Sequence, residues 1–147
     1  PLNLEFINTV GRTGGGDAPE CYELVLREGR TVQPWTAGAT KLLVVIGDNL
    51  PHEKNYPGNT QKIDWKNELN LLIEAGINVY GVHALGTGHS AAFYKTIAET
   101  TGGHYIQLDQ FGMVNDMILA VCYKQLGEDK LQALEETIVS TGRMDRA

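Results

Sequence analysis

The sequence of 147 residues has few cysteines, no cluster of basic side chains and no long apolar run. Its two cysteines, Cys21 and Cys122, are too few for a disulfide framework and favour a reducing compartment such as the cytoplasm. No apolar stretch approaches the roughly 20 residues that cross a bilayer, so we expect no membrane span. The formal net charge of −6 disfavours nucleic acids and anionic membranes as partners, because both reward a basic face.

The composition that remains is that of an ordinary globular protein, with 42% apolar and 20% charged residues. The length predicts a single domain over residues 1–147. Three apolar segments, at residues 41–48, 77–84 and 102–109, have largely lost the alternation of a half-exposed strand. Strands that are covered on both faces show this pattern, so we expect buried parallel strands.

Helices are predicted around these strands, at residues 18–28, 61–75, 91–101, 112–126 and about 128–140. Gly76 is a natural helix stop and Ser90 a natural cap. The apolar spacing in segment 2–10 fits a strand or a helix, and we favour a helix. Alternation of strands and helices predicts an α/β fold with a doubly wound, mainly parallel sheet, in which ligands bind beyond the carboxyl ends of the strands.

The stretch "TGGGDAPECYELVL" at residues 13–26 places two carboxylates, Asp17 and Glu20, where a glycine-rich loop is expected to become a helix. One interpretation is a capping box, with Asp17 as the N-cap and Glu20 as its partner. The other is a metal site at the edge of the sheet. Asp48 favours the second, because it ends an apolar strand and must face solvent, a helix terminus or a cation. Mg²⁺ keeps several waters and needs only one or two protein carboxylates.

Four segments in this order, "GGGDAPECYELVL", "KLLVVIGDNLPH", "LNLLIEAGINVYGVHA" and "IAETTGGHYIQL", together resemble the von Willebrand factor type A domain. The "DAPE" loop is most similar to the integrin β-subunit variety. The resemblance covers about residues 3–125, and it implies a Rossmann-like three-layer fold with a metal ion-dependent adhesion site that binds Mg²⁺, or Mn²⁺ or Ca²⁺.

Carried over by position, Glu20 resembles the ligand from the second loop of that family's site and Asp48 the aspartate from its third loop. Asp17 resembles an acid that serves a neighbouring cation site in the integrin β variety, and Thr13 is a secondary candidate. The resemblance implies a protein partner that completes the metal coordination with an acidic side chain.

The chain departs from the family because it contains no D-x-S-x-S, the motif that supplies the first loop. It therefore resembles the C-terminal portion of the domain, with a core at 13–126 and an extra helix at about 128–140. A cation would keep only two protein carboxylates and would bind weakly to this chain alone. In the family's strand order, segment 41–48 lies beside the missing first strand. We therefore expect a second chain, in a homo-oligomer or from an upstream fragment, to complete the sheet.

Three functions follow from these observations. The first is a non-enzymatic protein-interaction module with a partial metal site. The second is a structural remnant that has lost its metal. The third is a nucleotide-binding or enzymatic Rossmann-like domain, against which the acids at positions 17 and 20 count, because they repel a phosphate. His83 and His89 lie near the same predicted edge, and we expect satisfied or solvated histidines there rather than metal ligands.

Overall fold

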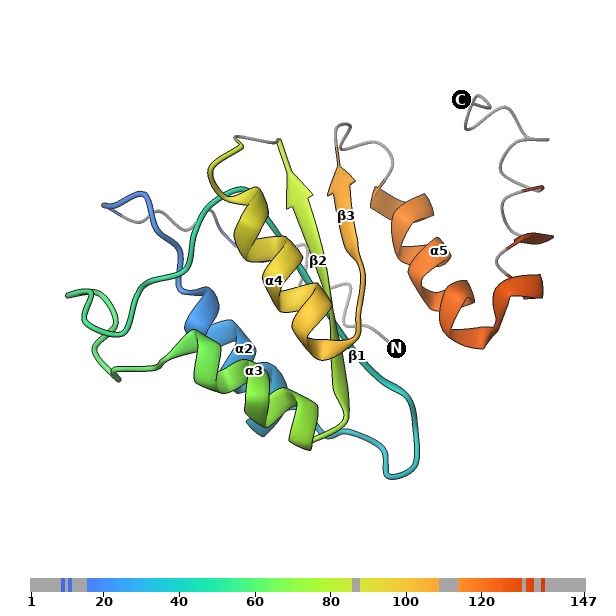
Figure 1. The fold of residues 1–147 in the computed structure, drawn as a ribbon, viewed down its shortest axis with the longest axis horizontal. Helices are drawn as coiled ribbons and strands as arrows, with labels where there is room; N and C mark the ends of the chain where they lie inside the picture. The colour runs from blue at the N-terminus through green and yellow to red at the C-terminus, as the bar shows by residue number, and fades with distance from the viewer. Residues whose placement is uncertain are drawn as a thin grey trace.

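A computed structural model describes residues 9, 11, 16–85, 88–108, 114–130, 132, 133 and 136. The described helices are α2 (Tyr22–Thr31), α3 (Trp65–Glu74), α4 (Ala91–Thr101) and α5 (Val114–Leu126), and the strands are β1 (Lys41–Gly47), β2 (Ile77–Ala84) and β3 (Tyr105–Leu108) (Figure 1). Thr13 and much of segment 128–140 lie outside the described residues, as does segment 2–10 apart from Thr9, which is helical.

The three strands form one parallel sheet in the order β1-β2-β3. Lys41 of β1 is level with Ile77 of β2, and Gly81 of β2 is level with Tyr105 of β3. All three strands therefore end at the same edge, which is the upper edge in Figure 1. This arrangement confirms the predicted α/β class and the parallel sheet.

Alternate residues of β2 face opposite sides of the sheet. Ile77 and Val79 belong to a buried cluster with residues of α2, α3 and α4, whereas Tyr80 and Val82 pack with Val121 of α5. Helices thus cover both faces of β2, which explains why its sequence shows no polar alternation. The layers agree with the predicted three-layer sandwich, and the sheet is small.

The helices begin and end where local chemistry allows. Asp64 caps α3 by accepting hydrogen bonds from the backbone N–H groups of Lys66 and Asn67. Gly102 ends α4 in the left-handed conformation, with φ of 75°, which glycine adopts without steric cost. The predicted range 91–101 for this helix is confirmed, while α3 begins at Trp65, later than the predicted residue 61.

The predicted capping box at Asp17 is wrong. The helix begins at Tyr22 instead of residue 18, and Cys21 occupies the N-cap position with no side-chain capping bond. The reason is that Glu20 forms a parallel β-bridge with Pro51, and an extended backbone at that position excludes an earlier helical turn. Asp17 is therefore free of a capping role, and its carboxylate makes other contacts.

β1 pairs with β2 along one edge only, within the part of the chain that the structure describes. Ile46 near its end is 38% exposed, and Leu42, Leu43 and Val44 are each partly exposed. An apolar strand with an unpaired edge offers backbone groups to another strand. Among the described helices, none is long and apolar enough to span a membrane.

Candidate functional site at the carboxyl edge of the sheet

Two loops meet at the carboxyl edge of the sheet, one before α2 and one after β1. The backbone N–H of Glu20 donates a 2.8 Å hydrogen bond to the carbonyl oxygen of Leu50. The backbone N–H of His52 returns one of 3.1 Å to the carbonyl oxygen of Glu20. These two bonds fix the start of α2 against the loop that follows Asp48. The two acids predicted as metal ligands therefore come from loops that lie side by side.

The Tyr22 hydroxyl lies near both of the loops that carry these two acids. Burial raises the pKa of the Tyr22 hydroxyl above its usual range, and the negative charges of Glu20 and Asp48 raise that pKa further. The hydroxyl lies over Gly47 at the end of β1, where a Cβ atom would come within 1.9 Å of it. The Tyr22 phenol thus lies at the strand end, close to the two loops that carry Glu20 and Asp48.

A chain of hydrogen bonds connects Asp48 to the interior of the sheet. The Ser90 hydroxyl donates to the carbonyl oxygen of Asp48 at 2.7 Å, and Nε2 of His83 lies 2.9 Å from the Ser90 oxygen. The Tyr105 hydroxyl lies 3.4 Å from Nδ1 of His83. Because Ser90 uses its proton on Asp48, His83 carries its proton on Nε2 and accepts from Tyr105. His83 is thus a satisfied buried histidine, as predicted.

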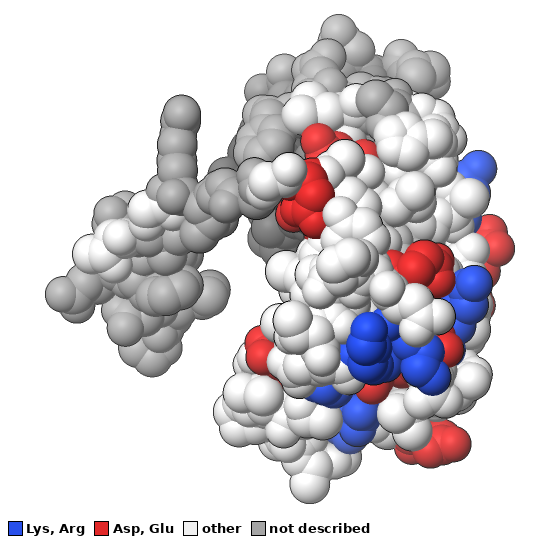
Figure 2. All heavy atoms as spheres, turned by 90° about the vertical axis from the view of Figure 1, so that its left-hand side faces the viewer, with Lys and Arg blue, Asp and Glu red and all other residues white. Residues whose placement is uncertain are grey.

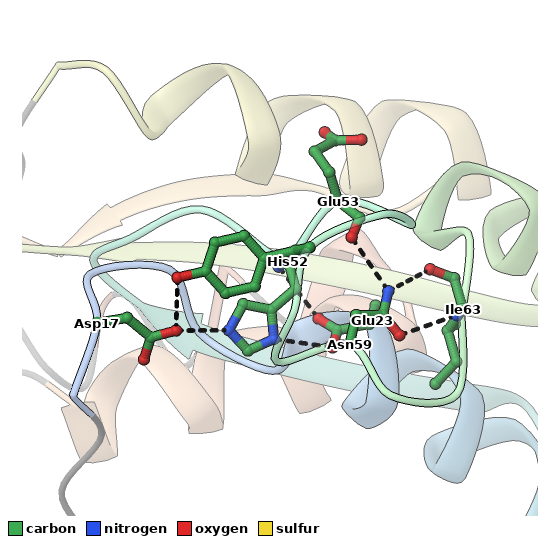
Figure 3. A network of polar contacts seen from close by, with 7 residues as sticks. Asp17, Glu23, His52, Glu53, Asn59 and Ile63 are labelled. Carbon is green, nitrogen blue, oxygen red and sulfur yellow. Dashed lines mark hydrogen bonds and ion pairs between the residues drawn. The ribbon is translucent and has the colours of Figure 1, made fainter.

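Asp17 belongs to a second polar cluster at this edge, which we call the His52 cluster: Asp17, Glu23, His52 and Tyr56. Asp17, Glu23 and His52 are labelled in Figure 3. Glu23 is 2% exposed and accepts two hydrogen bonds from His52, one from the backbone N–H at 3.1 Å and one from ring Nδ1 at 3.0 Å. The Tyr56 ring stacks on the imidazole with centroids 4.7 Å apart. Its hydroxyl donates a 2.7 Å hydrogen bond to Oδ2 of Asp17, and this bond raises the pKa of Tyr56.

The second ring nitrogen of His52, Nε2, differs from Nδ1 in its contacts. Nε2 is buried and has no hydrogen-bond partner within the described part of the chain. Oδ2 of Asp17 lies 3.5 Å from it, which is an ion-pair distance and too long for a good hydrogen bond. The His52 side chain is 10% exposed, and that of Asp17 is 36% exposed. Asp17 therefore forms the solvent side of the cluster, while Glu23 forms its buried side.

An apolar hollow of about 360 Å³ adjoins the His52 cluster. Its walls include Pro19, Pro51, Tyr56, Trp65 and Phe93. Glu53 is the acidic residue of its lining, and a carboxylate oxygen of this residue accepts a 3.3 Å hydrogen bond from the indole N–H of Trp65. Figure 2 shows acidic side chains in the upper part of the adjoining face, and further acidic side chains among the basic ones that gather lower down. The edge combines apolar space with negative charge.

Sequence reasoning identified some of this edge and missed the rest. Glu20 and Asp48 belong to loops that lie side by side at this edge, and their role as metal ligands stays a prediction. Asp17 turns toward His52 and Tyr56. Glu23 and His52 were not predicted as members of a site. A signal for Glu23 was present, because it lies three residues before the buried Leu26 on the inward face of the helix. An acid on an apolar face needs a buried partner.

Within the described residues, no three acidic, histidine or cysteine side chains gather closely enough to form a complete metal site. A cation at Glu20 and Asp48, or at the His52 cluster, would therefore take its other ligands from water or from a partner. Comparison with known proteins adds no assignment, because no protein-family model and no curated protein sequence matches the chain. The von Willebrand factor type A resemblance and the metal ligands stay predictions.

Proposed function

We propose that this protein is a non-enzymatic protein-interaction module of the von Willebrand factor type A kind, whose contact surface is the carboxyl edge of the sheet. The observation that carries the proposal is the pair of backbone hydrogen bonds, of 2.8 and 3.1 Å, that join Glu20 to Leu50 and His52 in the loop that follows Asp48. The Glu20–Pro51 bridge supports it, because it holds the two acid-bearing loops in one arrangement. A surface built this way can hold a partner without changing it chemically.

A hard divalent cation, with Mg²⁺ as the first candidate and Mn²⁺ or Ca²⁺ as alternatives, would lie between Glu20 and Asp48. Such ions accept one or two carboxylates and fill the remaining positions with water. A carboxylate on the partner protein would replace one of these waters and complete the contact. With two ligands from this chain the ion binds weakly by itself, and partner and metal stabilise each other's binding.

The apolar hollow that adjoins the His52 cluster, and that is lined by Pro19, Leu50 and Pro51 of the same two loops, supports a protein as the partner. A carboxylate alone makes a small contact, whereas an apolar side chain in the hollow of about 360 Å³ would add buried area beside it. The acidic edge disfavours the alternative of a nucleotide-binding domain, because a phosphate placed near Glu20 and Asp48 meets two negative charges. The second alternative is a structural remnant, which predicts the same fold with no cation binding.

Calorimetric titration with Mg²⁺ and Mn²⁺ tests the proposal on the wild-type chain, Glu20→Gln and Asp48→Asn. We expect weak binding to the wild type and loss of that binding in both variants. Glu74→Gln is the matched control, since Glu74 is an exposed acid at the end of α3 and its change removes the same charge. The absence of binding in the wild type, at concentrations where Mg²⁺ saturates ordinary weak sites, would leave the structural remnant as the better reading.

The unpaired edge of β1 supports a second contact, in which a further strand from another chain completes the sheet. Edge pairing supplies backbone hydrogen bonds and covers the partly exposed Leu42 and Val44. Sedimentation equilibrium of the wild type and Val44→Lys tests it, because a lysine on an edge strand opposes pairing with another strand. We expect concentration-dependent association that the lysine weakens, and a wild type that stays monomeric at high concentration contradicts it.

A further inference from the structure

We propose that His52 and Asp17 form a binding site for a divalent transition metal, with Zn²⁺ as the ion that matches it best. The site is separate from the Mg²⁺ site proposed at Glu20 and Asp48 and does not rest on it. Its ligands would be Nε2 of His52 and Oδ2 of Asp17. Imidazole nitrogen together with a carboxylate suits Zn²⁺ and its neighbours, whereas Mg²⁺ prefers oxygen ligands alone.

The first argument is the state of the His52 ring. Nδ1 lies 3.0 Å from Oε1 of Glu23, a carboxylate oxygen that can only accept, so Nδ1 carries a proton. In a neutral ring the lone pair is then on Nε2, and it faces Oδ2 of Asp17, which is also an acceptor. Two acceptors facing each other in a buried place repel, unless a cation or a second proton lies between them. One positive charge between Nε2 of His52 and Oδ2 of Asp17 would therefore remove this repulsion.

The second argument is distance. An ion about 2.1 Å from each of two ligand atoms that are 3.5 Å apart would make an angle of about 113° between them. The tetrahedral angle preferred by Zn²⁺ sites is within a few degrees of this value. The ligand atoms would consequently need little movement to receive the ion. A contact at 3.5 Å is long for a direct hydrogen bond and suitable for two atoms that share a metal.

The third argument is the support around the ligands. Histidines that bind metals usually donate their other ring proton to a carboxylate or a carbonyl, which fixes the ring and makes the ligand nitrogen more basic. Glu23 occupies that position, and it is 2% exposed. Tyr56 holds the ring by stacking and holds Asp17 by its hydroxyl. Both ligands are therefore oriented before any ion arrives.

The fourth argument is charge. With a neutral ring the cluster holds the two negative charges of Glu23 and Asp17, and the side chain of Glu23 is almost fully buried, at 3% exposure. A divalent cation balances these charges. The more exposed Asp17, at 36%, leaves one side of the site open to solvent. Water, or a donor from a protein bound at the neighbouring edge, would fill the positions that the chain does not supply.

Titration of the chain with ZnCl₂, followed by calorimetry and by thermal unfolding, tests the site. We expect the wild type to bind a single ion and to unfold at a higher temperature with Zn²⁺, because only the folded state holds the ligands together. His52→Gln and Asp17→Asn should lose this binding. Glu23→Gln should weaken it by about 10- to 100-fold, the usual effect of removing the group that orients a metal-binding histidine.

His89→Gln is the matched control, because His89 is an exposed histidine near the same edge and its change should leave Zn²⁺ binding unaltered. Asp48→Asn should also leave it unaltered while removing Mg²⁺ binding, so the two metal proposals fail separately. Binding of Zn²⁺ that survives both His52→Gln and Asp17→Asn would overturn the inference, as would a wild type that does not bind the ion.

Nitrogen NMR of the histidines tests the site on the wild-type protein alone, and so does not depend on whether the variants fold. The resonance of His52 Nε2 should move on addition of Zn²⁺, while Nδ1 keeps its proton. A spectrum in which both ring nitrogens are protonated before and after the addition would show that a second proton supplies the missing positive charge, and it would overturn the proposed metal site.

Discussion

The Ser90 hydroxyl donates a 2.7 Å hydrogen bond to the carbonyl oxygen of Asp48 and so joins the start of α4 to the end of β1. Ser90 is completely buried, and His83 approaches it from β2 at 2.9 Å. A residue that the sequence predicted as a helix cap is the N-cap by position but makes no capping bond with its side chain. Its hydroxyl instead serves the sheet edge on which the candidate site is built.

Ser90→Ala should therefore destabilise the protein by about 2 kcal/mol, since it leaves the buried Nε2 of His83 and the part-buried carbonyl oxygen of Asp48 without this partner. The free energy of unfolding from urea titration measures the effect. Thr96→Ala is the control, because the Thr96 hydroxyl makes a bond of the same length, 2.7 Å, to the carbonyl oxygen of Ala92 on an exposed helix surface. We expect the control to change the free energy by less than about 0.5 kcal/mol. Equal effects would contradict the role given to Ser90.

Gly81→Ala should destabilise the fold by about 3 kcal/mol, at the upper end of the range for overpacking. A Cβ atom at this position of β2 would lie 2.2 Å from the carbonyl oxygen of Tyr94, and backbone cannot move aside as a side chain can. α4 packs closely on the sheet only because residue 81 lacks a side chain. Gly88→Ala provides the comparison, since a Cβ there meets nothing within 4 Å. Similar unfolding temperatures for the two variants would show that α4 can shift.

The contact between α2 and α3 depends on an ion pair with one buried member. Nη2 of Arg30 lies 2.8 Å from Oε2 of Glu68, whose side chain is 8% exposed while that of Arg30 is 23% exposed. Arg30→Met should lower the free energy of unfolding by about 2 kcal/mol, because it leaves the Glu68 charge buried and unpaired. Adding Glu68→Met should restore most of the loss, since an apolar pair replaces the ions.

A double-mutant cycle for Arg30 and Glu68 measures this coupling directly. Additive losses in the cycle would show that the two charges act independently, despite the short distance between them.

Alkaline pH should weaken the fold through the tyrosines at the sheet edge. Burial raises the pKa of Tyr22 and of Tyr94 in the folded protein above the usual value of about 10. Above pH 10 the unfolded chain therefore loses these protons more readily than the folded one. Their contribution to stability is complete below pH 10 and declines as the pH rises toward the folded pKa values.

Unfolding free energies measured between about pH 9 and about pH 11 should fall less steeply for Tyr22→Phe than for the wild type. Tyrosinate absorbance in the folded state provides an independent check. A wild-type titration in which all phenols ionise together at about pH 10 would contradict the raised pKa values.

β2 could be predicted from the sequence because it is buried on both faces, and α4 because local signals mark its two ends. Segment 77–84 has no polar alternation, and the structure places apolar layers on either side of it. The helix after Ser90 ends at Gly102, which is a signal that needs no knowledge of the rest of the chain. The start of α2 could not be found in this way, since it is set by the bridge from Glu20 to Pro51, 31 positions away.

The same distinction separates the two parts of the candidate site. Glu20 and Asp48 could be proposed from the sequence because strand ends and loop acids are visible there, and their joint role as metal ligands stays a prediction. The His52 cluster joins Asp17, Glu23, His52 and Tyr56, and it exists because the bridged loops bring residue 52 back onto α2. His52 and Glu23 are 29 positions apart in the sequence, and no known motif has this spacing. Pairings of this kind depend on the tertiary arrangement and become visible only with coordinates.

Asn59 has a consequence for binding at this edge. Its side-chain oxygen accepts a 2.9 Å hydrogen bond from the backbone N–H of Ile63, and its side-chain nitrogen donates one of 2.7 Å to the Ile63 carbonyl oxygen (Figure 3). The same nitrogen lies 3.3 Å from the carbonyl oxygen of Glu53. The buried Asn59 amide thus fixes the far end of the loop that carries His52 by hydrogen bonds. An ion or protein that arrives there meets a preorganised loop, and little conformational entropy is left to lose on binding.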